Sequence, residues 1–167
     1  MDGRRAFFED LAGRWDAQQP AGRHAWLCQL VAPYEPLLSS AAAILDVGSG
    51  TGAMLEVLHE RAPAARVVGV DLAHAMLARA SARGAAAGVA QSDAHRLPFA
   101  PAAFDALVCH NSFPHFEAPA RVLAEAKRLL RPGGHLLILH DKSREAINAI
   151  HSSVNPAVSH DLLPPGR

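Results

Sequence analysis

Residues 44–52 read ILDVGSGTG, a short apolar run that ends in an acid and three alternating glycines. Such a run before a glycine turn is typical of a buried strand. Glycine adopts positive φ and lets the backbone approach a ligand closely, because no Cβ stands in the way. In open α/β sheets, ligands bind at the carboxyl ends of the strands. The stretch therefore predicts a strand whose end opens into a pocket for a nucleotide-like ligand.

The rest of the chain alternates between short β-rich runs and longer helical stretches. Strands are expected at 43–47, 66–70, 104–109 and 135–140, with a weaker one at 88–92. Helices are expected between them at 53–62, 73–86 and 118–131, the last ending at residues 131–134, RPGG. This alternation predicts βαβ units, and hence a Rossmann-like, doubly wound, mostly parallel sheet with helices on both faces.

A chain of 167 residues is expected to form one domain with a sizeable core. We expect a helical cap of two helices in residues 1–40 and a βαβ core in 41–141. Residues 142–167 are expected to hold one helix, from Ser143 to His151, and an irregular tail.

Composition and charge exclude several classes of function. Lys plus Arg and Asp plus Glu both number 16, so no net field attracts nucleic acid or anionic lipid. The first 13 residues carry charges and no apolar core of a signal peptide, and no run is long enough to span a membrane, so a cytoplasmic protein is expected. Cys28 and Cys109 lie outside any CxxC pairing, which indicates neither a disulfide framework nor a zinc site.

Four blocks of sequence, in order, carry a resemblance to a known family. They are LDVGSGTG at 45–52, VVGVDL at 67–72 followed by AML at 75–77, SDAHRLPF at 92–99 running into FDALV at 104–108, and LLRPGGHL at 129–136. Over roughly residues 7–145 the chain resembles class I S-adenosylmethionine-dependent methyltransferases of the small-molecule type. It is similar to the ubiquinone/menaquinone-biosynthesis methyltransferases. The resemblance implies methyl transfer from S-adenosylmethionine to a small-molecule acceptor by in-line displacement, and it leaves the acceptor and the methylated atom open.

The same blocks indicate which residues would bind the cofactor. Asp71 ends the second strand about 20 residues beyond the glycines, where a carboxylate can accept both ribose hydroxyls. The resemblance adds roles for the others: the glycine turn meets the methionyl part, Asp93 and Ala94 meet adenine, and Asn111 lies near the transferred methyl group. The full predicted set is Asp46, Gly48, Ser49, Gly50, Gly52, Asp71, Leu72, Met76, Asp93, Ala94 and Asn111. Asp46 and Asp93 could instead be turn or helix caps, and Met76 could be plain core.

Catalytic residues are harder to identify, because a sulfonium is already an activated leaving group. The protein has mainly to hold the reactants in line and exclude water. Histidine titrates near neutrality, so His115 and His140, on loops after two strands, are the first candidates for a base or an acceptor-orienting group. A metal site of His110, His115 and His140 is a weak alternative, because no Cys or acidic partner stands at ligand spacing.

The chain departs from the family at the end of the sheet. Members have seven strands, and residues after His140 contain no convincing strand pair. Either the chain is truncated, or something else, such as a second copy, closes the sheet edge. The apolar fifth strand would otherwise be a pairing liability, so we expect a homodimer or weak solubility.

Two other classes of function remain open. A non-catalytic or truncated cofactor-binding module, acting as a partner subunit, would fit the missing strands. An NAD(P)-dependent oxidoreductase would fit the looser glycine pattern Gly48-x-Gly50-x-x-Ala53. Against the oxidoreductase, the only tyrosine is Tyr34, upstream of the glycines, so no downstream Tyr-Lys proton relay is available.

Overall fold

The computed structural model describes residues 3–84 and 86–151. Its centre is a sheet of five strands in the order β3-β2-β1-β4-β5, in which every pairing is parallel. The strands are β1 (Ala43–Val47), β2 (Arg66–Asp71), β3 (Gly88–Gln91), β4 (Phe104–His110) and β5 (Leu130–Leu139). The expected doubly wound α/β fold is confirmed.

The central strand β1 explains where a ligand can bind. All five of its residues are buried, as a strand flanked and covered on both faces requires. The chain first builds outward from β1 to β2 and β3, and then crosses to the other side of β1 to build β4 and β5. The carboxyl ends of β1 and β4 therefore diverge at the switch point of the sheet, the usual place for a ligand in this architecture.

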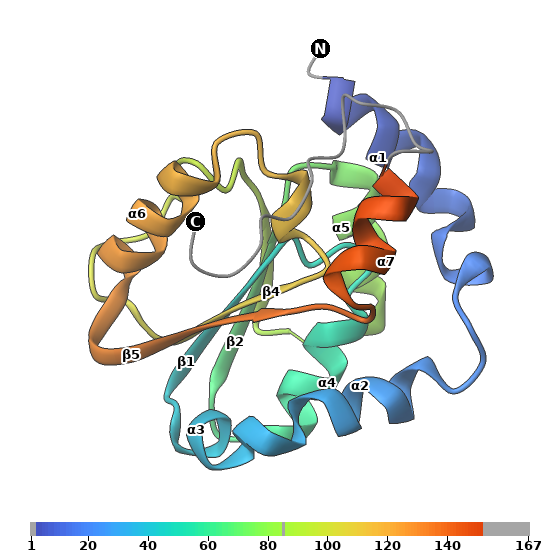
Figure 1. Ribbon diagram of the computed structural model, residues 1–167. Coiled ribbons are helices and arrows are strands. Elements are labelled where there is room, and N and C mark those ends of the chain that lie inside the picture. The colour runs from blue at the N-terminus through green and yellow to red at the C-terminus, as the bar shows by residue number, and fades with distance from the viewer. Residues whose placement is uncertain (1–2, 85, 152–167) are drawn as a thin grey trace.

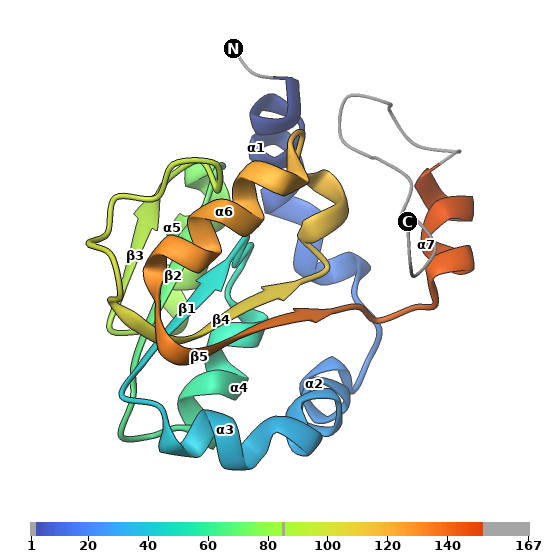
Figure 2. The ribbon, with the colours of Figure 1, turned by 60° about the vertical axis from the view of Figure 1, so that its left-hand side comes forward.

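Helices cover both faces of the sheet (Figures 1 and 2). They are α1 (Gly3–Trp15), α2 (Arg23–Val31), α3 (Glu35–Ser40), α4 (Ala53–Arg61), α5 (His74–Arg83), α6 (Pro119–Leu129) and α7 (Arg144–His151). Alternation along β1 divides the core, because successive side chains of a strand point to opposite faces. Ile44 packs with Leu27 and Leu55, from α2 and α4, whereas Leu45 packs with Leu129 of α6 on the other face. Among the described residues, no helix is long and apolar enough to cross a membrane.

The N-terminal region differs from the two helices expected there. The run from His24 to Leu38 is divided into α2 and α3 by a 3-10 turn at Ala32–Tyr34. Pro33 and Pro36 account for this break, because proline has no N–H to donate to the carbonyl one turn earlier in the helix.

The last strand also differs from expectation at its start. It begins at Leu130, not at 135, and its pairing with β4 shifts between Phe104–Leu130 and Ala106–His135. Residues 131–134, RPGG, form this irregularity, with Gly133 at a φ of 80°. Within residues 3–84 and 86–151, β5 is the outer strand of the sheet and no strand follows it. Residues 152–167 of the expected C-terminal tail lie outside the described residues.

Candidate active site

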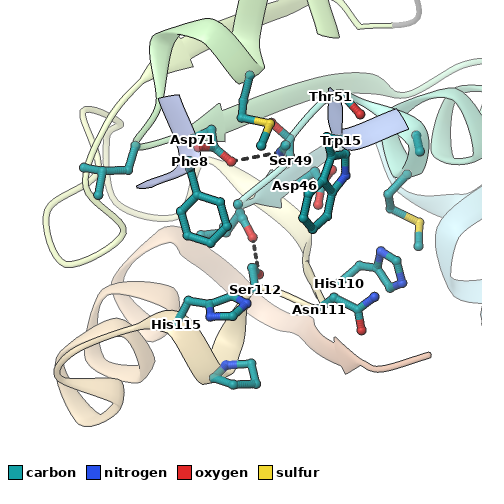
Figure 3. A pocket seen from close by; sticks show the side chains of 18 of the residues that line it. Phe8, Trp15, Asp46, Ser49, Thr51, Asp71, His110, Asn111, Ser112 and His115 are labelled. Atoms are coloured by element: carbon teal, nitrogen blue, oxygen red, sulfur yellow. Dashed lines mark hydrogen bonds between the residues drawn. The ribbon is translucent and has the colours of Figure 1, made fainter. Parts of the chain in front are cut away.

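A cavity of about 580 Å³ opens at the carboxyl ends of β1, β2 and β4 (Figure 3). This volume lies in the range of small-molecule and cofactor sites. Ten of the predicted cofactor-binding residues line it, together with His115: Asp46, Gly48, Ser49, Gly50, Asp71, Leu72, Met76, Asp93, Ala94 and Asn111. The other two predicted residues, Gly52 and His140, are not part of the lining.

The glycine turn is attached to the end of β2. The backbone N–H groups of Gly48 and Ser49 both donate to the carbonyl of Val70, at 2.8 and 2.9 Å. The N–H of Gly50 donates to the Asp71 carboxylate at 2.9 Å. Gly48 and Gly50 have φ values of 77° and 55°, the left-handed region that glycine adopts without strain. The glycine turn and Asp71, the last residue of β2, therefore lie next to each other, as a single nucleoside site requires.

Asp71 is largely buried and already hydrogen-bonded. Burial raises the pKa of its carboxyl above the ordinary value, and hydrogen bonds from the N–H groups of Ala73 and Gly50 oppose that rise. Each of these two amides is bonded to a different carboxylate oxygen. The carboxylate is thus held in one orientation while it faces the cavity.

Asp46 is the most unusual group of the site. It lies at the end of β1, it is buried, and neither carboxylate oxygen has a hydrogen-bond partner among the described residues. Burial, and then the charge of Asp71, raises the pKa of Asp46 to about 8. Buried polar groups are nearly always hydrogen-bonded, so such an exception calls for an explanation. A cationic group of a ligand in the cavity would supply the missing partner.

Gly48 and Gly52 of the turn have different structural roles. A Cβ at Gly48 would lie 2.4 Å from the Cβ of Ser112, whose hydroxyl donates to the Val47 carbonyl at 2.6 Å. Gly48 therefore allows the ends of β1 and β4 to approach. Gly52 precedes α4 at a φ of 89°, and a Cβ there would lie 3.0 Å from Ala80 of α5. Gly52 therefore allows α4 to pack against α5, and its expected contact with the cofactor stays a prediction.

The third loop, after β3, is ordered by His95. Its Nδ1 and its backbone N–H contact one carboxylate oxygen of Asp93. The N–H of Ala118 donates to the Nε2 of His95 at 3.1 Å, so the ring proton is on Nδ1. Burial acts to raise the pKa of Asp93, but its hydrogen bonds with His95 outweigh this effect and the pKa lies below its ordinary value.

The N-terminal helix α1 covers the cavity and is tied down by two acids. Glu9 accepts hydrogen bonds from the N–H groups of His74 and Ala75, at 2.9 and 2.7 Å, at the start of α5. Asp16, just after α1, accepts from the Thr51 hydroxyl at 2.6 Å and pairs with Arg79. Phe8 and Trp15 of this segment line the cavity. Sequence reasoning did not assign Glu9 or Asp16, since their partners lie 35 to 66 residues away.

At the ends of β4 and β5, a buried histidine and a partly exposed acid form a pair. The Nε2 of His110, the last residue of β4, lies 2.5 Å from a carboxylate oxygen of Asp141, and the His110 side chain is 5% exposed. Burial acts to raise the pKa of Asp141, but its hydrogen bond and charge interaction with His110 dominate, and the pKa is lowered. Asn111 has a φ of 54°, and its side chain accepts from the Asp141 N–H at 3.0 Å. Sequence reasoning missed this pair, although His110 ends β4 and Asp141 follows the neighbouring strand β5.

The predicted catalytic histidines differ in position. His115 lines the cavity, and its ring meets Phe8 edge to face at 5.3 Å between centroids. In Figure 3, His110, Asn111 and His115 lie together on the side of the cavity formed by the loop after β4. Asp141, the neighbour of His140, lines the cavity. The side chains of His140 and Asp141 point in opposite directions because the two residues are adjacent at the end of β5. This explains why Asp141 faces the cavity and His140 does not.

Potential metal ligands do not gather in the cavity. Within the described ranges, the one group of His, Cys, Asp or Glu side chains close enough to hold an ion is His24, Cys28 and Glu60. These residues belong to α2 and α4, and His24 pairs with Glu60 at 2.9 Å. The suggested group of His110, His115 and His140 is not formed.

Comparison with known proteins agrees with this architecture. The family model "Methyltransferase domain" matches residues 45–138. A demethylmenaquinone methyltransferase of Thermus thermophilus is 44% identical over 100 residues, which cover 58% of this chain and 46% of that protein. The ubiquinone/menaquinone biosynthesis C-methyltransferase UbiE of Desulfotalea psychrophila is 33% identical, covering 88% of this chain and 61% of its own length. A SAM-dependent methyltransferase structure from Aquifex aeolicus has a TM-score of 0.67 at 20% identity, covering 85% and 86% of the two chains.

The fold and the site together define a Rossmann-like, cofactor-binding domain of the kind found in class I methyltransferases. The chain belongs to the methyltransferase domain family, and its cofactor is S-adenosylmethionine. The unpartnered carboxylate of Asp46 and the open space beside Gly50 fit the amino-acid end of this molecule. The chain spans 46% and 61% of the lengths of these two curated relatives.

Proposed function

We propose that this chain transfers the methyl group of S-adenosylmethionine to a small-molecule acceptor by in-line displacement. The observation that carries the proposal is the cavity in which Asp46, Gly50 and Asp71 converge. The relatives named for quinone methylation support a small acceptor. Apolar walls from Phe8, Trp15 and Phe116 support an acceptor with an apolar part.

The proposed binding mode assigns the charged groups to the polar parts of the cofactor. Asp71 accepts the ribose hydroxyls, Asp46 pairs with the ammonium group, and Asp93 with Ala94 meets the polar edge of adenine. Leu72 and Met76 cover the adenine face. The backbone at Asn111 lines the side from which the acceptor approaches.

When bound, the cofactor supplies a methyl group on a leaving group that needs no further activation. The chain has to exclude water and align the acceptor. Phe8 and Trp15, held over the cavity by the contacts of Glu9 and Asp16, perform the first task. For an acceptor that must lose a proton, His115 and the His110–Asp141 pair are the groups placed to hold it, and His140 remains the second candidate predicted from the sequence.

Isothermal titration calorimetry with S-adenosylmethionine, S-adenosylhomocysteine and NADH tests the proposal. We expect micromolar binding of the first two and none of NADH. Binding of NADH would indicate an NAD(P)-dependent oxidoreductase. If none of the three ligands bound, the chain would be a non-catalytic module. Transfer of a radiolabelled methyl group to a panel of quinones, phenols, amines and thiols then tests catalysis. Cofactor binding without transfer to any acceptor, in the full-length protein, would support a cofactor-binding partner subunit.

A further inference from the structure

A second charged group in the cavity lacks a contact partner. Arg23 is the first residue of α2, and its side chain lines the cavity. Its Nε is buried and has no hydrogen-bond partner among the described residues. Burial lowers the pKa of the guanidinium, and the charges of Asp141 and Asp16 oppose this only from a distance. The side chain of Arg23 is partly buried, and its buried Nε lacks a partner, so a ligand that accepts a hydrogen bond from it gains binding free energy.

The nearby acids are engaged elsewhere. Asp141 bonds to His110, and Asp16 bonds to Thr51 and pairs with Arg79. The other cations that line the cavity are also accounted for. Arg4 pairs with Glu117 at 3.2 Å, and Lys142 is exposed to water. Among the described residues that line the cavity, Arg23 is therefore the arginine that offers a buried N–H to an anion.

Arg23 and Asp46 have opposite charges, line the same cavity, and each contains a buried atom without a partner. A ligand that carries both a carboxylate and an ammonium group would satisfy both residues. The amino-acid end of S-adenosylmethionine is such a group. We propose that Arg23 binds the carboxylate of the cofactor while Asp46 binds its ammonium group. This inference depends on the cofactor and not on the acceptor.

The surrounding structure holds Arg23 in a defined place. The preceding Gly22, at a φ of 77°, starts α2, and Leu27 anchors the helix in the core. His24 pairs with Glu60 at 2.9 Å and links α2 to α4, the helix that follows the glycine turn. The position of the guanidinium relative to that turn is thus set by packed elements. Such preorganisation is what a site needs to distinguish ligands by charge.

The test compares ligands that differ in the groups they carry beyond the ribose. Decarboxylated S-adenosylmethionine lacks only the carboxylate, whereas 5′-methylthioadenosine lacks the whole amino-acid chain and the positive charge on sulfur. Calorimetry is performed with these two and with S-adenosylmethionine on the wild type and R23M, with R14M as the control. Arg14 is exposed, pairs with Asp10, and is not among the described residues that line the cavity.

We expect R23M to weaken S-adenosylmethionine roughly 10- to 100-fold, as for loss of a charged hydrogen bond. Binding of the other two ligands should change less than about twofold, and R14M should bind all three like the wild type. Equal loss for all three ligands would show a general structural role and would overturn the inference. So would unchanged binding, which would assign Arg23 to the acceptor. If the wild type itself failed to bind S-adenosylmethionine, the proposed function would fail instead.

Discussion

The backbone N–H of Gly50 and the carboxylate of Asp71 are joined by a 2.9 Å hydrogen bond. This contact connects the turn after β1 to the acid after β2, which are neighbouring parallel strands. Parallel pairing brings the two carboxyl ends to one edge of the sheet, and the hydrogen bond fixes their distance. A nucleoside can therefore meet a bare backbone and a carboxylate within one cavity.

Replacing Asp71 by Ala should weaken binding of S-adenosylhomocysteine by about 1–3 kcal/mol, because the ribose hydroxyls and the Gly50 amide both lose their acceptor. Calorimetry measures the loss. The exposed Asp10, which only pairs with Arg14, offers D10A as a matched control. Unchanged affinity in D71A would remove this residue from the site.

Cofactor affinity should depend on pH through Asp46, whose pKa is raised to about 8 by burial. Below that pH the free protein carries a proton on Asp46, and pairing with the ligand ammonium must expel it. Affinity should therefore rise from pH 6 to about pH 8, and fall again at higher pH, where the ligand's ammonium group loses its own proton. Titration of S-adenosylhomocysteine across this range is the measurement. The rise should be much smaller in D46N, and an identical pH profile in wild type and variant would contradict the assignment.

The same group should make the ligand-free protein less stable at higher pH. The folded pKa of Asp46, about 8, lies above its ordinary value of 3.8, so the folded state retains a proton that the unfolded chain loses between these values. Stability then falls as the pH rises through this window. D46N removes the effect, so its Tm advantage over the wild type should grow between pH 5 and pH 8. A difference in Tm that is constant with pH would refute this account.

Two glycines of the turn provide a matched pair of substitutions. In G48A the new Cβ would meet Ser112 at 2.4 Å and φ would be 77°, whereas in G50A φ is 55° and nothing lies within 4 Å. We expect G50A to cost about 1 kcal/mol in unfolding free energy, from backbone strain alone. G48A should cost at least about 2 kcal/mol, because either β1 or β4 must also shift. Urea denaturation measures both, and equal losses would show that the contact with Ser112 relaxes without cost.

Much of this site could be predicted from the sequence because its parts are local. A buried strand that ends in glycines, and another that ends in an acid, are each encoded within a few residues, and the βαβ alternation makes the strands parallel. Asp46, Gly48, Gly50 and Asp71, which were predicted to bind the cofactor, all line the cavity. The boundaries of α3 and β5 were less accurate, because prolines and an irregular register decide them.

The sequence by itself determined where strands and helices alternate along the chain, where the glycine turn lies, and which acids end the strands. Each of these features depends on the residue pattern of a short segment. Only the tertiary structure decided which charged groups meet. Arg23, His110 and Asp141 come from a helix, a strand end and a loop that are far apart in the chain, and folding brings them to one cavity. Whether a side chain such as Asp141 or its neighbour His140 faces that cavity depends on the direction of the backbone at the end of β5, which no local pattern specifies.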